Sequence, residues 1–275
     1  MRWLVILLGA AAAIAAACNQ PDTNPHDVIS LAVDTAPAPS IVAGDTMRIG
    51  DSTALGQLQA QAYNIGQQKL NVPILWLTLD PAVVTTDTFG HVFAGTDSVP
   101  STPRIIAEAG GLQSLPFTLN IVPRPDSMAR DTTDADTLIR GQCASGPITA
   151  GFNATLFHRA PFADSGAVGV GSYLVHWAIT SPANLVGKQT GTVAHIDSEF
   201  AFVSDPSGNP SLIDTTKTGG ISTRELVFGL AAFDTTITPF NDTVTVVVTA
   251  TARYQGRQLH NPVNVTIKFV NPRKC

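Results

Sequence analysis

The sequence is poor in charged residues. Only 13% of its 275 residues are Asp, Glu, Lys or Arg, about half the usual fraction, and its formal net charge is −5. No basic cluster exceeds the final Arg273 and Lys274. Because proteins that bind nucleic acids need a basic face to neutralise phosphates, the sequence predicts no nucleic-acid partner.

Motifs for metal-dependent or nucleophilic catalysis are also missing. The six histidines are scattered without the spacing of metal ligands, so we expect no metal site and no cofactor. The stretch "IGDSTALG", residues 49–56, resembles the first block of GDS-type lipases, in which Ser52 would be the nucleophile. Those enzymes also need a downstream Asp-x-x-His pair, and no Asp stands three residues before any His. We therefore expect no catalytic residues, and a serine hydrolase using Ser52 is the least favoured alternative.

One acidic turn offers oxygen ligands of the kind that calcium takes. It carries Asp205, Asn209 and Asp214, but their spacing is not that of an EF-hand. Asp, Asn, Gly and Pro are common in turns for backbone reasons, which favours a plain turn here.

Long hydrophobic runs are absent except at the N-terminus. There, Arg2 precedes an unbroken apolar run, and Ala15 to Ala17 supply the small residues that a signal peptidase needs, so residues 1–17 are interpreted as a signal peptide. Cys18 follows at once, as in the bacterial lipobox, although Ala15 stands where that pattern prefers Leu. We expect Cys18 to be lipidated and residues 18–27 to form a tether, so that a lipid anchor holds the protein at the bacterial outer membrane or cell surface.

Cysteine is scarce, and its number is odd. If the chain is exported and Cys18 carries lipid, the other two of its three cysteines, Cys143 and Cys275, are left as a pair. A disulfide between them would close a loop of about 130 residues and stabilise the fold by about 4–5 kcal/mol at most in the chain-entropy model. Two free thiols are the alternative.

The abundant residues indicate β-structure. Val and Ala share one face and Thr lines the other through "TVTVVVTATAR", residues 243–253, and "VNVTIKF" repeats the pattern after the turn "YQGRQ". Residues 222–233 begin like a helix capping box, yet their alternation favours a strand. Short strands between Gly, Pro, Asp and Asn turns predict an all-β protein of two tandem β-sandwiches.

Residues 123–141 separate the two halves. This segment includes "PRPDSMARDTTDAD", which lacks apolar periodicity and contains two prolines and several acidic groups. It is interpreted as a linker between a first domain at 28–122 and a second at 142–275.

The first half resembles a bacterial immunoglobulin-like domain of the group-2 type, found in surface proteins such as intimins and invasins. The matching stretches are "VAGDTMRI" (42–49), "VPILWLTLDPAVVTTDTFGHVFAG" (72–95) and "PRIIAEAGGLQSLPFTLNIV" (103–122), with "GDSTALG" inserted after Ile49. The resemblance implies a sandwich with Trp76 in its core and a turn at Gly90 that needs positive φ.

The second half resembles longer immunoglobulin-like surface repeats more weakly, with Trp177 in "VHWAIT" as its core tryptophan. The two resemblances together imply two tandem immunoglobulin-like β-sandwiches in a cell-envelope lipoprotein. Such a protein would act as a non-catalytic binding or adhesion module whose partners are the membrane, through its lipid, and an envelope glycan or protein. Inert spacer domains are the alternative, because the fold alone does not define a function.

Overall fold

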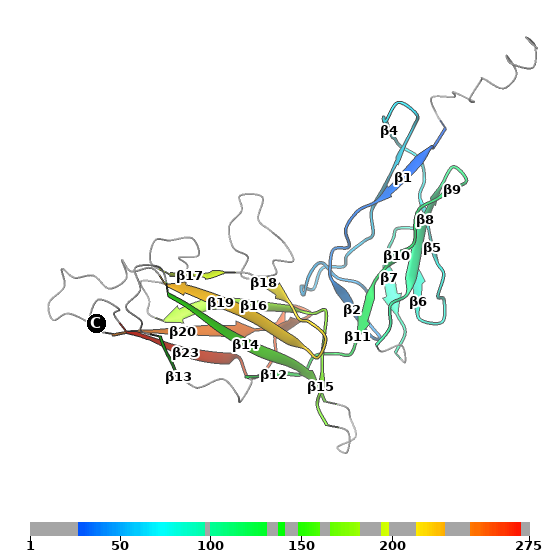
Figure 1. The fold of residues 1–275 in the computed structure, drawn as a ribbon. Coiled ribbons are helices and arrows are strands. Elements are labelled where there is room, and N and C mark those ends of the chain that lie inside the picture. The colour runs from blue at the N-terminus through cyan, green and yellow to red at the C-terminus, as the bar shows by residue number, and fades with distance from the viewer. Residues whose placement is uncertain are drawn as a thin grey trace, which may run out of the picture.

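A computed structural model describes residues 27–96, 100–130, 137–140, 148–159, 166–181, 194–197, 213–228 and 243–270. All regular structure within these ranges is β-strand. None of the described residues forms a helix that meets the length and hydropathy needed to cross a membrane. Figure 1 shows two lobes, one built from β1 to β11 and the other from β12 to β23.

The first sandwich has two layers. One layer contains the parallel pair β2 (Ser40–Val42) and β11 (Asn120–Val122) and the sheet with the order β10 (Phe117–Thr118), β8 (Arg104–Ala109), β5 (Leu75–Thr78), with β9 (Leu112–Gln113) beside β8. The other contains β1 (Ser30–Val33), β3 (Ala60–Tyr63) and β4 (Lys69–Leu70), together with the pair β6 (Val84–Thr86) and β7 (Val92–Ala94). The segment leading into β3 holds this second layer together, because Met47 N donates to Val92 O at 2.8 Å and Leu58 N to Gly90 O at 2.9 Å.

The second sandwich pairs two larger sheets. Its first sheet has the order β12 (Ser127–Ala129), β14 (Ile148–His158), β19 (Ile221–Phe228), β17 (Ala194–Asp197), with β15 (Val168–Gly169) beside β14. Its second has the order β13 (Thr137–Arg140), β23 (Val263–Val270), β20 (Thr243–Thr251), β16 (Leu174–Ser181), β18 (Ile213–Thr215). Between β20 and β23, the short strands β21 (Arg253–Tyr254) and β22 (Arg257–Gln258) form a hairpin.

Both sandwiches have the immunoglobulin strand order. In the second, the sheets correspond to A-B-E-D and A′-G-F-C, and β13 runs parallel to β23 as A′ does to G. In the first, β2 is likewise parallel to β11, and β5, β8 and β10 correspond to C, F and G. The second sandwich departs from the pattern at β18, which pairs with β16 although it follows β17 in sequence. The chain is therefore all-β, with two tandem immunoglobulin-like sandwiches.

Each core contains the tryptophan of its C strand. Trp76 on β5 is 6% exposed, and Trp177 on β16 is 1% exposed. The indole ring of Trp177 packs at 57° to the ring of Phe152 on β14, with centroids 5.0 Å apart, and its Nε1 donates to Ser222 Oγ at 2.9 Å. The tilted ring contact stabilises the buried indole, and the bond to Ser222 replaces the hydrogen bond to water that its N–H loses on burial.

The segment interpreted as a linker contains strands. Ser127–Ala129 pairs with β14 and Thr137–Arg140 pairs with β23, so the described residues of this segment include two edge strands of the second sandwich. The sequence pattern was misleading because edge strands are short and tolerate polar residues. The strand predicted within 222–233 is confirmed as β19, and the turn at Gly90 has the expected positive φ, at 86°.

Candidate functional site

The junction between the two sandwiches gathers polar side chains that are far apart in the sequence. On the first sandwich they come from residues 45–56, where the chain interrupts the strand that continues as β3. On the second they come from the β21–β22 hairpin and from β16. The ends of β2 and β11 also reach the second sandwich, since Val42 and Val122 belong to its hydrophobic core (Figure 1).

The inserted stretch "GDSTALG" forms a closed loop on the first sandwich. Arg48 forms an isolated bridge with Leu55, and Ile49 N donates to Ala54 O at 2.9 Å. Gly56 N then donates to Met47 O at 2.9 Å, and the chain resumes its strand. The insertion therefore leaves the sheet intact and projects residues 50–54 away from it.

A tight hairpin on the second sandwich meets this loop. Tyr254 pairs with Arg257, so Gln255 and Gly256 alone form the turn, with φ values of 50° and 73°. Positive φ at both central positions is the requirement of a type I′ turn, which suits the twist of the flanking strands. This rigid turn places Gln255 and Gly256 against the first sandwich.

Asp45 is the most connected group at the junction. Its carboxylate accepts hydrogen bonds from Arg48 Nε at 3.0 Å and Nη2 at 2.9 Å within the first sandwich. It also accepts from Gln255 Nε2 at 3.0 Å and from the Tyr254 hydroxyl at 3.2 Å on the second. Burial alone would raise the pKa of Asp45, but the bonds from Arg48, Gln255 and the Thr46 amide outweigh it, and this pKa is lowered.

Asp51 makes a second pair of contacts across the junction. Its Oδ2 lies 2.7 Å from His176 Nε2 on β16, and its backbone oxygen accepts from Gly256 N at 2.8 Å. The side chains of Asp51 and His176 are only 13% and 23% exposed. We call the contacts of Asp45 and Asp51 with the second sandwich the junction clamp.

Ser52 has a structural role in the same loop. Its hydroxyl donates to Ile49 O at 2.7 Å and accepts from Ala54 N at 3.2 Å, which closes a local turn. The nearby imidazole of His176 is paired with Asp51. The resemblance to a lipase block is thus explained by turn chemistry, in which Ser and Asp bond to the neighbouring backbone.

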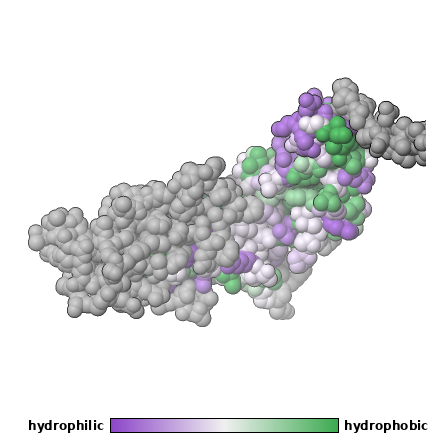
Figure 2. Space-filling model, turned by 45° about the horizontal axis from the view of Figure 1, so that its top comes forward, coloured by the Kyte–Doolittle hydropathy of each residue, from purple (hydrophilic) through white to green (hydrophobic). Residues whose placement is uncertain are grey.

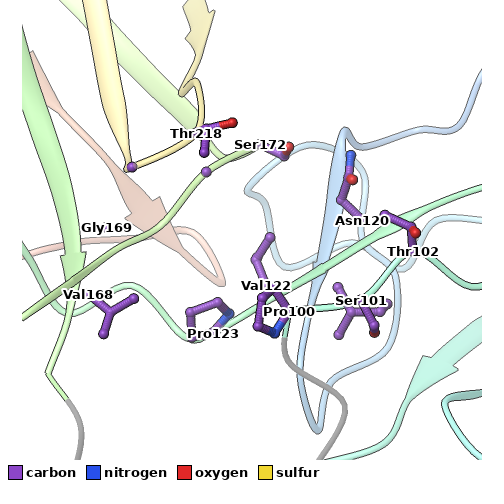
Figure 3. A pocket seen from close by; sticks show the side chains of 13 residues that line it. Pro100, Ser101, Thr102, Asn120, Val122, Pro123, Val168, Gly169, Ser172 and Thr218 are labelled. Carbon is purple, nitrogen blue, oxygen red and sulfur yellow. The ribbon is translucent and has the colours of Figure 1, made fainter. Parts of the chain in front are cut away.

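Two hollows flank the clamp. A groove of about 390 Å³ is lined mainly by small and apolar residues of both sandwiches, and none of its described lining residues is charged. Figure 3 shows Val122 and Pro123 of the first-to-second connection and Val168 of β15 around this groove. On another side, a cleft of about 660 Å³ has a largely polar lining that includes Arg48, Arg124 and Arg257.

An exposed aromatic ring is fixed on a turn of the first sandwich. Phe89 is 71% exposed, and its backbone amide donates to Asp87 Oδ1 at 2.9 Å. The same carboxylate accepts from His91 N and lies 2.7 Å from His91 Nδ1, and this hydrogen bond lowers the pKa of Asp87. Figure 2 shows hydrophobic patches among hydrophilic ones over the first sandwich.

A buried polar network lies within the second sandwich. Ser222 Oγ donates to Asp214 Oδ2 at 2.6 Å, and the fully buried Arg224 donates from Nη2 to Ile213 O at 2.6 Å. Burial lowers the pKa of Arg224, an effect that Asp214, 3.7 Å away, partly offsets. Because these groups occupy the Asp214 carboxylate, it is not a free calcium ligand, while Asp205 and Asn209 lie outside the described residues.

The other predicted site residues fall largely outside the described part of the chain. Cys18, Cys143 and Cys275 all do, so the lipid and the disulfide remain predictions. Among the described residues, no three His, Cys, Asp or Glu side chains are grouped as metal ligands. Sequence reasoning missed Asp45, Asp51 and their partners, although the insertion itself had been recognised as a departure from the family pattern.

No protein-family model matches the chain, and no curated protein matches it. Among solved structures, domains 4 and 5 of the S-layer protein SbsC are 16% identical at a TM-score of 0.30, covering 89% of this chain and 99% of that one. The adhesin InvE of Yersinia pseudotuberculosis is 16% identical at a TM-score of 0.29, covering 89% and 61%. The protocadherin GammaB4 extracellular domain is 12% identical at 0.30, covering 90% and 34%. Because these TM-scores are low, the assignment of the fold rests on strand order and pairing alone.

Proposed function

We propose that this chain is a cell-envelope lipoprotein that acts by binding, with its two immunoglobulin-like sandwiches held as one rigid unit. The junction clamp is the observation that carries the proposal. Two carboxylates, each less than one seventh exposed, bond to the second sandwich through His176, Tyr254 and Gln255, and the backbone oxygen of Asp51 accepts from the Gly256 amide. A clamp of this kind fixes the walls of the hollows beside it before any ligand arrives, which reduces the entropy lost on binding.

A rigid clamp would also suit an inert spacer, so the surface beside it decides between the two functions. Arginines line the cleft next to the clamp, and the ring of Phe89 is exposed on its turn. Exposed aromatic rings and cations without partners contribute nothing to a spacer, whereas binding surfaces are enriched in both. These features favour the binding module. In this proposal the first sandwich is of the group-2 type, and the chain is not an enzyme.

The binding function can be tested with purified envelope fractions. Immobilised full-length protein is expected to retain a polysaccharide, peptidoglycan or outer-membrane fraction, and Asp45→Asn combined with His176→Gln should weaken that retention. Unchanged circular dichroism would show that both sandwiches remain folded in the variant. If the wild-type protein retains no fraction, the binding function is contradicted and the inert spacer is the function that fits.

The location of the protein rests on Cys18. We propose that this cysteine carries the lipid anchor and that Cys143 pairs with Cys275. The intact mass of membrane-extracted protein should exceed that of the processed polypeptide by acyl chains, and Cys18→Ser should release the protein from membranes. Non-reducing peptide mapping should yield one peptide pair joining the other two cysteines. An unmodified thiol at any of the three positions would refute the corresponding assignment.

A further inference from the structure

The polar cleft beside the clamp combines cations with an aromatic ring. It holds about 660 Å³ and lies where the β21–β22 hairpin meets the insertion and the connection between the sandwiches. Arg124 places its guanidinium carbon 4.9 Å from the centre of the Tyr254 ring, a cation–π contact that orients the side chain. Arg257 and His260 line the cleft from the second sandwich.

The positive charge of this cleft is only partly offset, by the one carboxylate of Asp126. Within the described part of the chain, neither Arg124 nor Arg257 has an acidic partner, and both are exposed. Asp126 is the carboxylate among the lining residues, and its Oδ2 accepts from Arg159 N at 3.0 Å. The whole chain carries only 16 basic residues against 21 acidic ones. The cleft is therefore a local positive site on an acidic protein.

Guanidinium groups match the planar geometry of carboxylates and can donate two parallel hydrogen bonds to one. The remaining lining groups include the amide of Gln258 and the hydroxyl of Thr53, which suit sugar hydroxyls. Resting on the binding function proposed above, we propose that the cleft binds a carboxylate-bearing segment of an acidic polysaccharide. A segment of a single polymer chain can enter a cleft of about 660 Å³, whereas a broad membrane surface cannot.

The test uses full-length protein and two labelled hexasaccharides, hexagalacturonate as the acidic probe and maltohexaose as its neutral counterpart. Binding is expected for hexagalacturonate alone, and it should weaken between 20 and 200 mM salt as charges are screened, a range of roughly threefold in Debye length. Arg257→Gln and Arg124→Gln should each weaken it by about tenfold, the effect of losing one charge-assisted hydrogen bond. Arg104→Gln is the matched control, because Arg104 is an exposed arginine that is paired with Asp80 and does not line this cleft.

Equal losses in Arg257→Gln and Arg104→Gln, or equal binding of maltohexaose, would overturn the proposal. Tighter binding to anionic phospholipid vesicles that also depends on Arg124 and Arg257 would overturn it in favour of a lipid surface. If an envelope fraction is still retained by the Arg124→Gln, Arg257→Gln double variant, the binding function stands and only this ligand is refuted. If wild-type protein retains no fraction and no probe, both are refuted.

Discussion

Replacing Asp45 with Asn tests whether the clamp holds the sandwiches together. The carboxylate of Asp45 accepts five hydrogen bonds, from Arg48 Nε and Nη2, Thr46 N, Gln255 Nε2 and the Tyr254 hydroxyl. An asparagine has one acceptor oxygen, so in either orientation its amide nitrogen faces donors that have lost their partner. Arg48 also loses its counter-charge at a site where its side chain is only 20% exposed.

Of the hydrogen bonds lost in Asp45→Asn, those from Gln255 and Tyr254 are the ones that cross the junction. Hydrogen bonds to charged groups contribute about 1.5–3 kcal/mol each when buried, and partial solvent access at this site reduces that contribution. We therefore expect the closed junction to lose about 2 kcal/mol, which is roughly a thirtyfold change in the equilibrium between closed and open arrangements.

Amide hydrogen exchange at Gly256 measures this opening, because its N–H donates to Asp51 O across the junction. Its protection should fall about thirtyfold in Asp45→Asn, while amides in the middle of β20 and β23 keep theirs. Asp80→Asn is the control, since Asp80 pairs with Arg104 inside the first sandwich. If Gly256 exchanges equally in both variants, the clamp does not set the junction and the reasoning fails.

Three further predictions follow from the geometry. The stability difference between wild type and Asp45→Asn should be constant from about pH 7 to 5 and shrink below about pH 4. The pKa of Asp45 is lowered in the folded protein, so its carboxylate stops contributing to stability as the pH falls through that folded pKa. Thermal unfolding measured over this pH range checks the prediction. Gly90→Ala should lower the free energy of unfolding in denaturant by more than about 3 kcal/mol, roughly twice the effect of Gly111→Ala. Both glycines have positive φ, but of the two only Gly90 would bring a Cβ to 2.6 Å from a backbone oxygen. Asp214→Ala should lower the free energy of unfolding by about 3–5 kcal/mol, because it leaves Arg224 buried without its counter-ion. Adding Arg224→Met should recover most of that loss, which a double-mutant cycle of unfolding measurements would show.

The strands of both sandwiches were predictable because their signals are local. Alternation through residues 243–253 predicted a strand that the structure places at Thr243–Thr251, and its buried face is the one with valines and alanines. The edge strands β12 and β13 were missed because they are short and their segment is polar, so neither alternation nor apolar content marked them. Their pairing is determined by β14 and β23, which supply the neighbouring backbone.

The junction was not predictable in the same way. Asp51 and His176 are 125 residues apart, and Asp45 lies 210 residues from Gln255. A turn that bonds to a distant domain has the same composition as a turn that faces water, because Asp, Ser and Gly satisfy both. The type I′ turn at Gln255 and Gly256 was visible as a hairpin, but nothing in its sequence indicates what its tip contacts.

One feature of the sequence did indicate the junction, namely the insertion after Ile49, which departs from the family pattern. The loop between Ile49 and Gly56 adds nothing to the core of the first sandwich, since Ile49 and Leu55 are more than half exposed. An insertion that holds the Asp51 carboxylate in place between two exposed apolar side chains is retained in a stable fold only if its contacts elsewhere compensate. Through Asp51 the insertion contacts the hairpin and His176, so it joins the two sandwiches. A carboxylate and an imidazole beside a serine would activate a nucleophile in an enzyme. Here the pair of Asp51 and His176 spans the interface between the sandwiches, and the hydroxyl of Ser52 is bonded to its own turn.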